Sequence, residues 1–392
     1  MEYLNESLLL TLVLAPLFGS IIAGFFGKKI GETASHTVTT LGVAIAFLLS
    51  VWVFKLVIFD GASYNDGVYQ WLQAGSLSIE VGFLVDSLTA MMLVVVTFVS
   101  LMVHIYTIGY MRGAKEANHT RFMFFYAVAI HATMGIALSG NLLTLFVFYE
   151  MLTFSTYPLV THKGDEAALK AGRVYLGILV SSSIVFLLFG VIGVWALAGT
   201  LDFVSGGILA GKIDPFYVPA LLALFAFGIG KAALMPLHRW LPAAMVAPTP
   251  VSALLHAVAV VKAGVFTVLK VSVYIFGIDF LKETGGSEWL VWVASFSILA
   301  ASIVAMTKTN LKARLAYSTV SQLGYIVMGA ALATPLAASG AALHIAAHGA
   351  GKITLFFCAG AIYVAHKRTD IRDMNGLGRT MPITYGAFAL AA

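Results

Sequence analysis

Charged residues and cysteine are scarce in this sequence of 392 residues: only 10% of the residues are charged, and Cys358 is its single cysteine. A soluble domain has about 25% charged residues, so the composition argues against a water-soluble protein. One cysteine excludes an intrachain disulfide, a cysteine-ligated zinc site and a self-contained iron–sulfur cluster. The sequence also contains neither a dinucleotide-binding fingerprint nor a phosphate-binding loop. These absences predict that the chain binds no cofactor and carries out no redox chemistry of its own.

Hydrophobic residues make up 60% of the sequence, and they occur in long runs. A run of about 20 apolar residues is long enough to cross the hydrocarbon core of a membrane. The pattern predicts an all-α polytopic membrane protein with helices near 7–27, 35–59, 83–110, 122–139, 141–161, 172–199, 216–246, 250–277, 288–307, 311–333 and 339–365. The first run precedes Lys28 and Lys29, which is the wrong order for a cleaved signal peptide. A last run from about 383 is too short to span, so we expect the C-terminal part to be truncated.

The basic residues predict the orientation of these helices. With the N-terminus outside, most lysines and arginines fall in cytoplasmic loops, and only Lys212, Lys270 and Lys282 fall in loops on the opposite side. Such an asymmetry is what the positive-inside rule predicts. It also accounts for the net charge of +5, so nucleic-acid binding is not needed to explain that charge.

Four charged residues lie well inside predicted helices: Glu150, Lys231, Lys262 and Lys352. Each charged side chain at that depth costs roughly 2.5–3.5 kcal/mol. Glu150 and Lys231 could form a buried ion pair, but such pairs contribute little to stability. Lys262 has no carboxylate left to pair with, and burial without a partner disfavours the charged form of an amine. A role in proton exchange explains these residues better than packing. Lys55, near a helix end, is expected only to extend towards the headgroups.

The run "HIAAHGAGK" places His344, His348 and Lys352 at intervals of four residues, on one face of a helix. Two histidines four residues apart can bind zinc, but no acidic or cysteine ligand is near and Lys352 would repel a cation, so we predict no metal site. Imidazoles are suited to a proton relay because their pKa lies near neutrality. The isolated His104 and His131 are expected to be hydrogen-bonded packing residues.

A helix break is predicted next to Lys231, because Pro236 lacks a backbone donor and clashes with the carbonyl of Ala232. Membrane transporters place ion-binding sites at such discontinuous helices, where freed backbone groups are enclosed by protein or water.

These residues resemble the antiporter-like proton-conducting subunits that respiratory complex I, membrane-bound hydrogenases and Mrp-type cation/proton antiporters share. The similarity covers essentially the whole chain and is carried by "GKAALMPLHRWLPAAMVAPTPVSALLHAVAVVKAGVF" (230–266), "LKARLAYSTVSQLGYIVMG" (311–329), "HIAAHGAGK" (344–352) and "VDSLTAMMLVVVTFVSLMVHIYTIGYM" (85–111).

The resemblance implies two inverted five-helix repeats, each with a discontinuous helix. It divides the chain into an N-terminal three-helix region (1–121), a first repeat forming a half-channel (122–287) and an incomplete second repeat (288–392). It also implies a proton pathway through Glu150, Lys231, His256, Lys262, His344, His348 and Lys352. The family's ionisable residue on the second broken helix would lie beyond residue 392.

Within this family, Lys262 resembles the Mrp D-type and complex I M/N-type subunits, the segment from Asp86 resembles the complex I L-type subunit, and residues 148–179 resemble the D-type. We favour an Mrp D-like subunit in the plasma membrane of a bacterium. Its expected partners are protons, other membrane subunits and the lipid bilayer, with sodium or potassium open as the coupled ion. Complex I, a membrane-bound hydrogenase and a bicarbonate-uptake complex are the alternatives.

Our hypothesis for the mechanism is that Glu150 and Lys231 form a switchable ion pair. Separation of the pair would release a proton towards Lys262 and then the histidines of 344–352. Two alternatives predict other behaviour: a passive scaffold whose charges only lock helices, and a quinone-reactive redox enzyme, against which the absent cofactor motifs argue.

Overall fold

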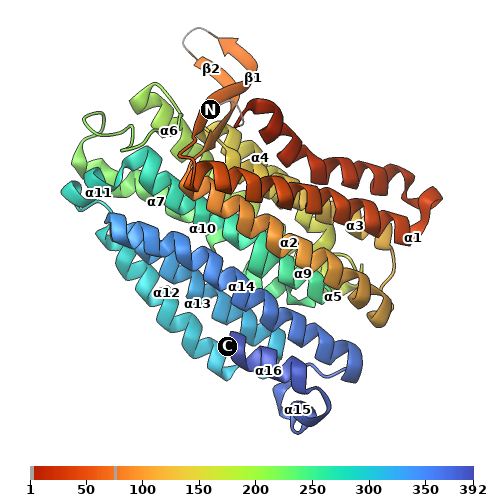
Figure 1. The fold of residues 1–392 in the computed structure, drawn as a ribbon. Helices are drawn as coiled ribbons and strands as arrows, with labels where there is room; N and C mark the ends of the chain where they lie inside the picture. The colour runs from red at the N-terminus through yellow and green to blue at the C-terminus, as the bar shows by residue number, and fades with distance from the viewer. Residues whose placement is uncertain (1–3, 75–76) are drawn as a thin grey trace.

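The computed structural model describes residues 4–74 and 77–392. Within this part of the chain, eight helices are long and apolar enough to cross a membrane. They lie side by side in one bundle (Figure 1). The protein is therefore an all-α polytopic membrane protein, as the composition predicts.

The N-terminal helices agree with the predicted spans. Helix α1 (Glu6–Ile58) contains a break at Gly31, whose φ of 80° and ψ of 174° divide it into two helices. A positive φ of this size is readily adopted only by glycine. The two halves correspond to the predicted helices 7–27 and 35–59. Helix α2 (Ser87–Ala114) follows, and the Asp86 side chain accepts a hydrogen bond from Thr89 N at its start.

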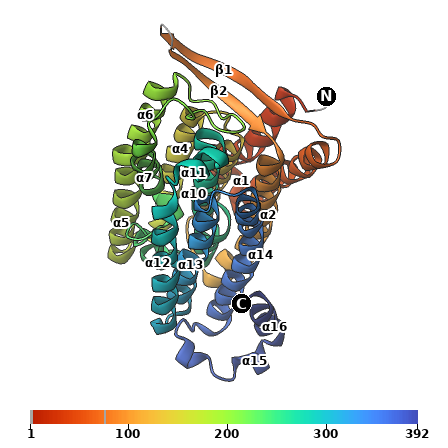
Figure 2. The same ribbon diagram turned by 90° about the vertical axis from the view of Figure 1, so that its left-hand side faces the viewer.

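A β-hairpin between α1 and α2 was not predicted. Strands β1 (Tyr64–Ala74) and β2 (Leu77–Val85) pair antiparallel and project from one end of the bundle (Figure 2). Residues 83–85, expected to begin a membrane helix, belong to β2 instead. The apolar run of this strand continues into α2, so hydrophobicity alone could not separate strand from helix. The capping residue Asp86 marks the boundary.

The central helices surround one long buried helix. This helix runs over Thr249–Phe276, and the most apolar part of it is entirely buried by its neighbours. It consists of α9 (Thr249–Ala253), the π-helical turn η5 (Leu254–Val258), α10 (Val260–Val271) and the π-helical turn η6 (Ser272–Phe276). The other elements of this part are α3 (His119–Leu138), α4 (Leu142–Val160), α5 (Glu166–Ser182), η1 (Ser183–Leu187), α6 (Leu188–Ala198), η2 (Pro215–Tyr217), α7 (Val218–Gly228), η3 (Gly230–Ala232), α8 (Trp240–Ala243), η4 (Ala244–Val246) and α11 (Ile278–Thr284).

The predicted helix break exists, but it begins before Pro236. Helix α7 ends at Gly228, Ile229 has a non-helical ψ of 60°, and Lys231 lies in the 3₁₀ turn η3. The helix ends at a close contact: a Cβ on Gly228 would lie 2.3 Å from the backbone nitrogen of Leu187. Two backbones can approach so closely only at glycine. The chain resumes an α-helix only at Trp240.

The C-terminal part packs against the central helix. Helices α12 (Glu288–Thr307) and α13 (Leu311–Ala331) form an adjacent pair beside α14 (Pro335–His366) (Figure 1). The segments η7 (Ile371–Met374), α15 (Leu377–Thr380) and α16 (Pro382–Ala391) follow, with α15 at the end of the bundle opposite the hairpin. Helix α13 was predicted as a span and has 21 residues, but it is not among the eight helices that are long and apolar enough to cross a membrane.

Candidate functional site

Lys231 is fully buried against α4. Its Nζ donates hydrogen bonds to Tyr149 O at 2.8 Å and to Thr153 Oγ1 at 2.6 Å. The same atom lies 3.1 Å from the centre of the Tyr149 ring, a cation–π contact. The helix break makes this geometry possible, because it lets the backbone N–H of Lys231 bond to Tyr149 Oη at 3.1 Å. The ammonium is solvated by neutral oxygens and a ring.

Glu150 does not form the expected ion pair with Lys231 in this structure. It lies near the middle of α4, and both of its carboxylate oxygens are buried without a hydrogen-bond donor among the described residues. The charge of Glu150 still acts on Lys231 through space. The hypothesis that Glu150 and Lys231 are in direct contact is therefore wrong for this structure, in which the two charges are separated. Buried carboxylate oxygens normally have a hydrogen-bond donor, and those of Glu150 are an exception within the described chain.

Lys262 and His348 form the closest contact between titratable groups in the site. Lys262 Nζ lies 2.6 Å from His348 Nδ1, and both side chains are buried. One residue comes from α10 and the other from α14. Because an ammonium has no acceptor capacity, Lys262 donates and the imidazole nitrogen accepts when the lysine is charged. His348 Nε2 has no partner among the described residues and is available for a further hydrogen bond.

The remaining predicted residues extend from this contact. The rings of His344 and His348 are parallel, with centroids 6.1 Å apart, and His344 Nε2 lies 2.8 Å from Gln322 Oε1. Lys352 Nζ donates to Ser318 Oγ at 3.0 Å. The repeated spacing of 344–352 therefore places three titratable groups along one face of α14, as predicted.

His256 lies on the same central helix as Lys262. It is fully buried, its ring packs against Phe356 at a centroid distance of 4.9 Å, and neither ring nitrogen has a partner within the described chain. The charges of Lys352 and Lys312 act on it through space. Like Glu150, His256 has no hydrogen-bond partner within the described chain.

Glycines connect the Lys231 region with the Lys262 region. A Cβ on Gly264 would lie 2.3 Å from the carbonyl carbon of Lys231, so α10 packs directly on the helix break. A Cβ on Gly349 would lie 3.9 Å from Lys262 Cε. The site is thus a row of groups from α4 through η3 and α10 to α14. We call it the buried row, and it consists of Glu150, Lys231, His256, Lys262, His344, His348 and Lys352.

Sequence reasoning missed the contribution of α13. Gln322 Oε1 accepts a hydrogen bond from His344 and Ser318 Oγ accepts one from Lys352, and the two residues lie four positions apart on that helix. Polar residues spaced by one turn on a membrane helix face the bundle interior. That spacing in "STVSQ" was the available signal.

Lys270 was predicted in a loop, and the structure contradicts this. It is fully buried on α10, and its Nζ donates to Ser139 O at 2.5 Å and Ala137 O at 3.1 Å. These carbonyls are at the end of α3, where a helix favours a cation. Asp86 interacts electrostatically with Lys270 and also accepts a hydrogen bond from Tyr274 Oη.

Three residues interpreted as non-functional have the expected surroundings. Lys55 is exposed and lies 3.8 Å from Asp60. His131 Nδ1 is 2.7 Å from Val13 O, and His104 Nδ1 is 2.9 Å from Ser100 O. The predicted hydrogen bonds of both histidines are confirmed.

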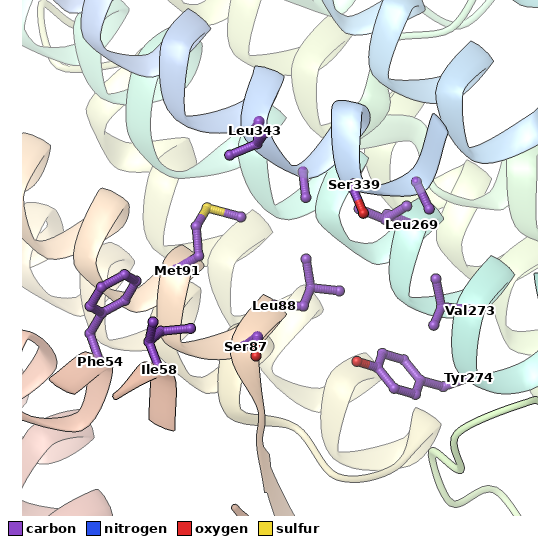
Figure 3. Close-up of a pocket in the computed structure, with 12 residues that line it drawn as sticks. Phe54, Ile58, Ser87, Leu88, Met91, Leu269, Val273, Tyr274, Ser339 and Leu343 are labelled. Atoms are coloured by element: carbon purple, nitrogen blue, oxygen red, sulfur yellow. The ribbon is translucent and has the colours of Figure 1, made fainter. Parts of the chain in front are cut away.

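A separate apolar cavity lies outside the buried row. It has a volume of about 480 Å³ and is lined by side chains of α1, α2, α10, η6 and α14, among them Leu88, Leu269 and Leu343. Figure 3 shows Tyr274 and Ser339 at its walls as two of the few polar groups. None of the residues of the buried row lines it. Among residues 4–74 and 77–392, no cluster of three or more histidine, cysteine or acidic side chains is placed to hold a metal ion.

Fold and site together define a class: a polytopic helical membrane protein with a discontinuous helix and a row of amines and imidazoles buried at its centre. The family model described as "NADH:quinone oxidoreductase/Mrp antiporter, TM" matches residues 139–392. A second model, described as "NADH-Ubiquinone oxidoreductase (complex I), chain 5 N-terminus", matches residues 71–123. The chain belongs to the NADH:quinone oxidoreductase/Mrp antiporter family of transmembrane subunits.

Curated relatives come from bacteria and eukaryotes. The chain is 37% identical to NADH-quinone oxidoreductase subunit L of Neisseria meningitidis serogroup B, over 97% of this chain and 57% of the relative. It is 32% identical to NADH-ubiquinone oxidoreductase chain 5 of Arabidopsis thaliana, over 98% of this chain and 57% of that protein. The chain therefore spans little more than half the length of these relatives.

Two solved structures have the same fold. A chain of the membrane-bound sulfane sulfur reductase, an archaeal respiratory membrane complex, superposes with a TM-score of 0.86 at 24% identity, covering 99% of this chain and 77% of that chain. A chain of the Mrp complex from Dietzia sp. gives a TM-score of 0.79 at 24% identity, covering 96% of this chain and 41% of that one.

Proposed function

We propose that the chain translocates protons across a membrane as one subunit of a larger complex. The contact between Lys262 and His348, at 2.6 Å, is the observation that carries this proposal. Two neighbouring basic groups without a carboxylate cannot both be protonated cheaply, because like charges in a low-dielectric interior repel strongly. The pair therefore holds one proton, which either nitrogen can carry. If the contact only stabilised the fold, a pair of neutral hydrogen-bonding side chains would do so at a lower desolvation cost.

The proposed path begins at Glu150 and Lys231. When the local field changes, Lys231 loses its proton through water to Lys262, because α10 packs on the break that carries Lys231. Lys262 passes the proton to His348 Nδ1, whose Nε2 then donates onward towards His344. Lys352 and His256 set the charge around this step, since both interact electrostatically with His348. Each transfer moves one proton and leaves the donor neutral.

Two kinds of complex are candidates for the one that contains this chain. The relatives named subunit L and chain 5 favour a redox-driven quinone oxidoreductase, in which other subunits carry the redox reaction. The Mrp D-like assignment from the sequence is the second candidate, and the Mrp structural neighbour supports it at the level of fold. Sodium or potassium as a coupled ion belongs to that second candidate. A bacterial plasma membrane remains our expectation for the location.

Replacing Lys231 by methionine in the reconstituted complex tests the proposal. The methylene stem and its packing are kept, but the titratable amine is lost, so the complex should assemble while proton translocation falls at least about tenfold, a barrier change of roughly 1.4 kcal/mol. Proton uptake into vesicles with a pH-sensitive dye measures this.

Lys55→Met is the matched control, because Lys55 lies on the exposed end of α1. Its translocation should equal that of the wild type. A passive scaffold predicts that Lys231→Met also translocates normally, and that result would refute the proposal.

A further inference from the structure

A second cavity, more polar than the first, lies at the end of the bundle opposite the hairpin. It has a volume of about 250 Å³ and is lined by the ends of α2, α13 and α14, by the loops after α4 and α14, and by the segment from Met245 to Thr249. A water molecule occupies about 30 Å³ in the liquid, so the cavity is large enough for a small polyatomic ion together with several waters. It is lined by none of the residues of the buried row.

The charges at this cavity are all of one sign. Lys163, Lys312 and Arg368 line it, and no aspartate or glutamate is among its lining residues. The charge of Lys163 acts on Lys312, which costs energy because like charges repel. Glu116 also acts on Lys312, but it does not line the cavity. The arrangement leaves an excess of positive charge around a partly open cavity.

Lys312 is half-buried, and its ammonium is fixed by a backbone carbonyl. Its Nζ donates to Ala247 O at 2.6 Å, and an ammonium has two further protons to donate. The positive-inside rule explains exposed lysines at a membrane surface. It does not explain a lysine fixed by a carbonyl at the wall of a cavity.

Backbone pairing fixes the position of Arg368 relative to Lys312. Leu311 N donates to Thr369 O at 2.9 Å, and Ile371 N donates to Thr309 O at 2.9 Å. The loop carrying Arg368 is thereby joined to the start of α13. On another side, Thr249 Oγ1 donates to Tyr110 Oη at 3.3 Å, which joins α9 to α2. The start of α13 adds the partial positive charge of a helix N-terminus.

We propose that this cavity is a binding site for a phosphate-type oxyanion, supplied by an anionic lipid headgroup or by a soluble phosphate. A tetrahedral dianion or monoanion offsets the repulsion between the three cations and accepts hydrogen bonds from several of them at once. It also joins the loop after α4, the start of α13 and the loop after α14. Basic pockets between membrane helices on the cytoplasmic side bind phosphate headgroups in this way.

The test measures binding to the assembled complex in detergent after delipidation. Inorganic phosphate is titrated against chloride at equal ionic strength, and the melting temperature is followed because a ligand that binds the folded state raises it. In a second arm the complex is exposed to phosphatidylglycerol, and bound lipid is counted by native mass spectrometry. A soluble source gives saturable stabilisation by phosphate; a lipid source gives bound phosphatidylglycerol and little effect of phosphate.

The variants Lys312→Gln and Arg368→Gln should each weaken whichever ligand binds by about tenfold, as expected on removing a charge-assisted hydrogen bond. Lys163 is exposed, so Lys163→Gln should fold normally even if Lys312→Gln does not. This variant should also weaken binding of the ligand. Lys282→Gln, exposed at the opposite end, is the control and should not change binding. Equal binding of both ligands by the wild type and by all three cavity variants would overturn the proposal, as would no binding of either ligand.

Discussion

The four buried lysines of the central and C-terminal helices are stabilised in different ways. Lys231 bonds to a carbonyl and a hydroxyl, Lys270 bonds to two carbonyls, and Lys352 bonds to a serine hydroxyl. Lys262 contacts His348 instead, a group that can itself take the proton. A carbonyl can only accept a hydrogen bond, whereas an imidazole can exchange a proton near neutral pH. All four lysines are buried, so Lys262 differs from the other three by its hydrogen-bond partner, His348.

Glu150→Gln tests whether the separated carboxylate acts through its charge. Neither carboxylate oxygen has a protein donor within the described chain, so the substitution breaks no hydrogen bond and should change stability by less than about 1 kcal/mol. Translocation should nevertheless fall, because Lys231 loses the acidic charge of Glu150 that acts on it. Melting in detergent and dye-monitored proton uptake measure the two effects. Normal uptake by this variant would remove Glu150 from the pathway.

His162, in the loop between α4 and α5, predicts a dependence of stability on pH. Burial, and after it the charge of Arg121, lowers its pKa from 6.5 to about 4. The unfolded chain therefore binds a proton at higher pH than the folded chain does, and stability falls as pH decreases from about 6.5 to 4. His162→Gln should flatten the decline of melting temperature over this range. An unchanged slope in the variant would contradict the assignment.

At the level of elements, the break in the discontinuous helix coincides with a close backbone contact. Pro236 correctly indicated an interruption, but α7 already ends at Gly228, where the backbone meets Leu187. Which glycine contacts which neighbour depends on the packing of helices far apart in sequence. The sequence could thus predict that a break occurs next to Lys231 but not that Lys231 would lie in a 3₁₀ turn.

Gly264→Ala should disturb the packing of α10 on the break. The added methyl would lie 2.3 Å from the backbone of Lys231 and Ala232, and overpacking of this kind typically costs about 1–3 kcal/mol. Melting temperature and proton uptake should both decrease. Gly177→Ala on α5 is the control: no atom lies within 4 Å of its added Cβ, and it should keep or increase stability. Equal behaviour of the two variants would refute the role given to this contact.

Helices were predicted well because long apolar runs and turn residues are local signals, and the residues of 344–352 were placed correctly for the same reason. The β-hairpin was missed because its second strand continues the apolar run of α2. Lys270 was misplaced because it is close to the end of a predicted span, where an exposed lysine is common. Its carbonyl partners at the end of α3 are 131 and 133 residues away in sequence. Such contacts are visible only in the folded chain.

The whole molecule encloses most of the buried row between its helices. The central helix Thr249–Phe276 carries His256 and Lys262 and is enclosed by the helices around it. Surrounding helices from both halves of the chain contribute partners, α4 on one side and α13 and α14 on the other. The division into regions 1–121, 122–287 and 288–392 stays a prediction. The chain covers 57% of its Neisseria relative. The subunit that drives translocation is therefore to be sought in the complete complex.

Proton translocation by Lys262→Met, compared with Lys270→Met in the same reconstituted complex, tests the central claim most directly. Both lysines are fully buried on α10, two turns and about 12 Å apart. Only Lys262 contacts a titratable partner in the buried row. The account predicts that Lys262→Met assembles and loses translocation, whereas Lys270→Met keeps its rate per assembled complex even where stability is reduced. Translocation retained by Lys262→Met, or lost equally in both variants, would contradict it.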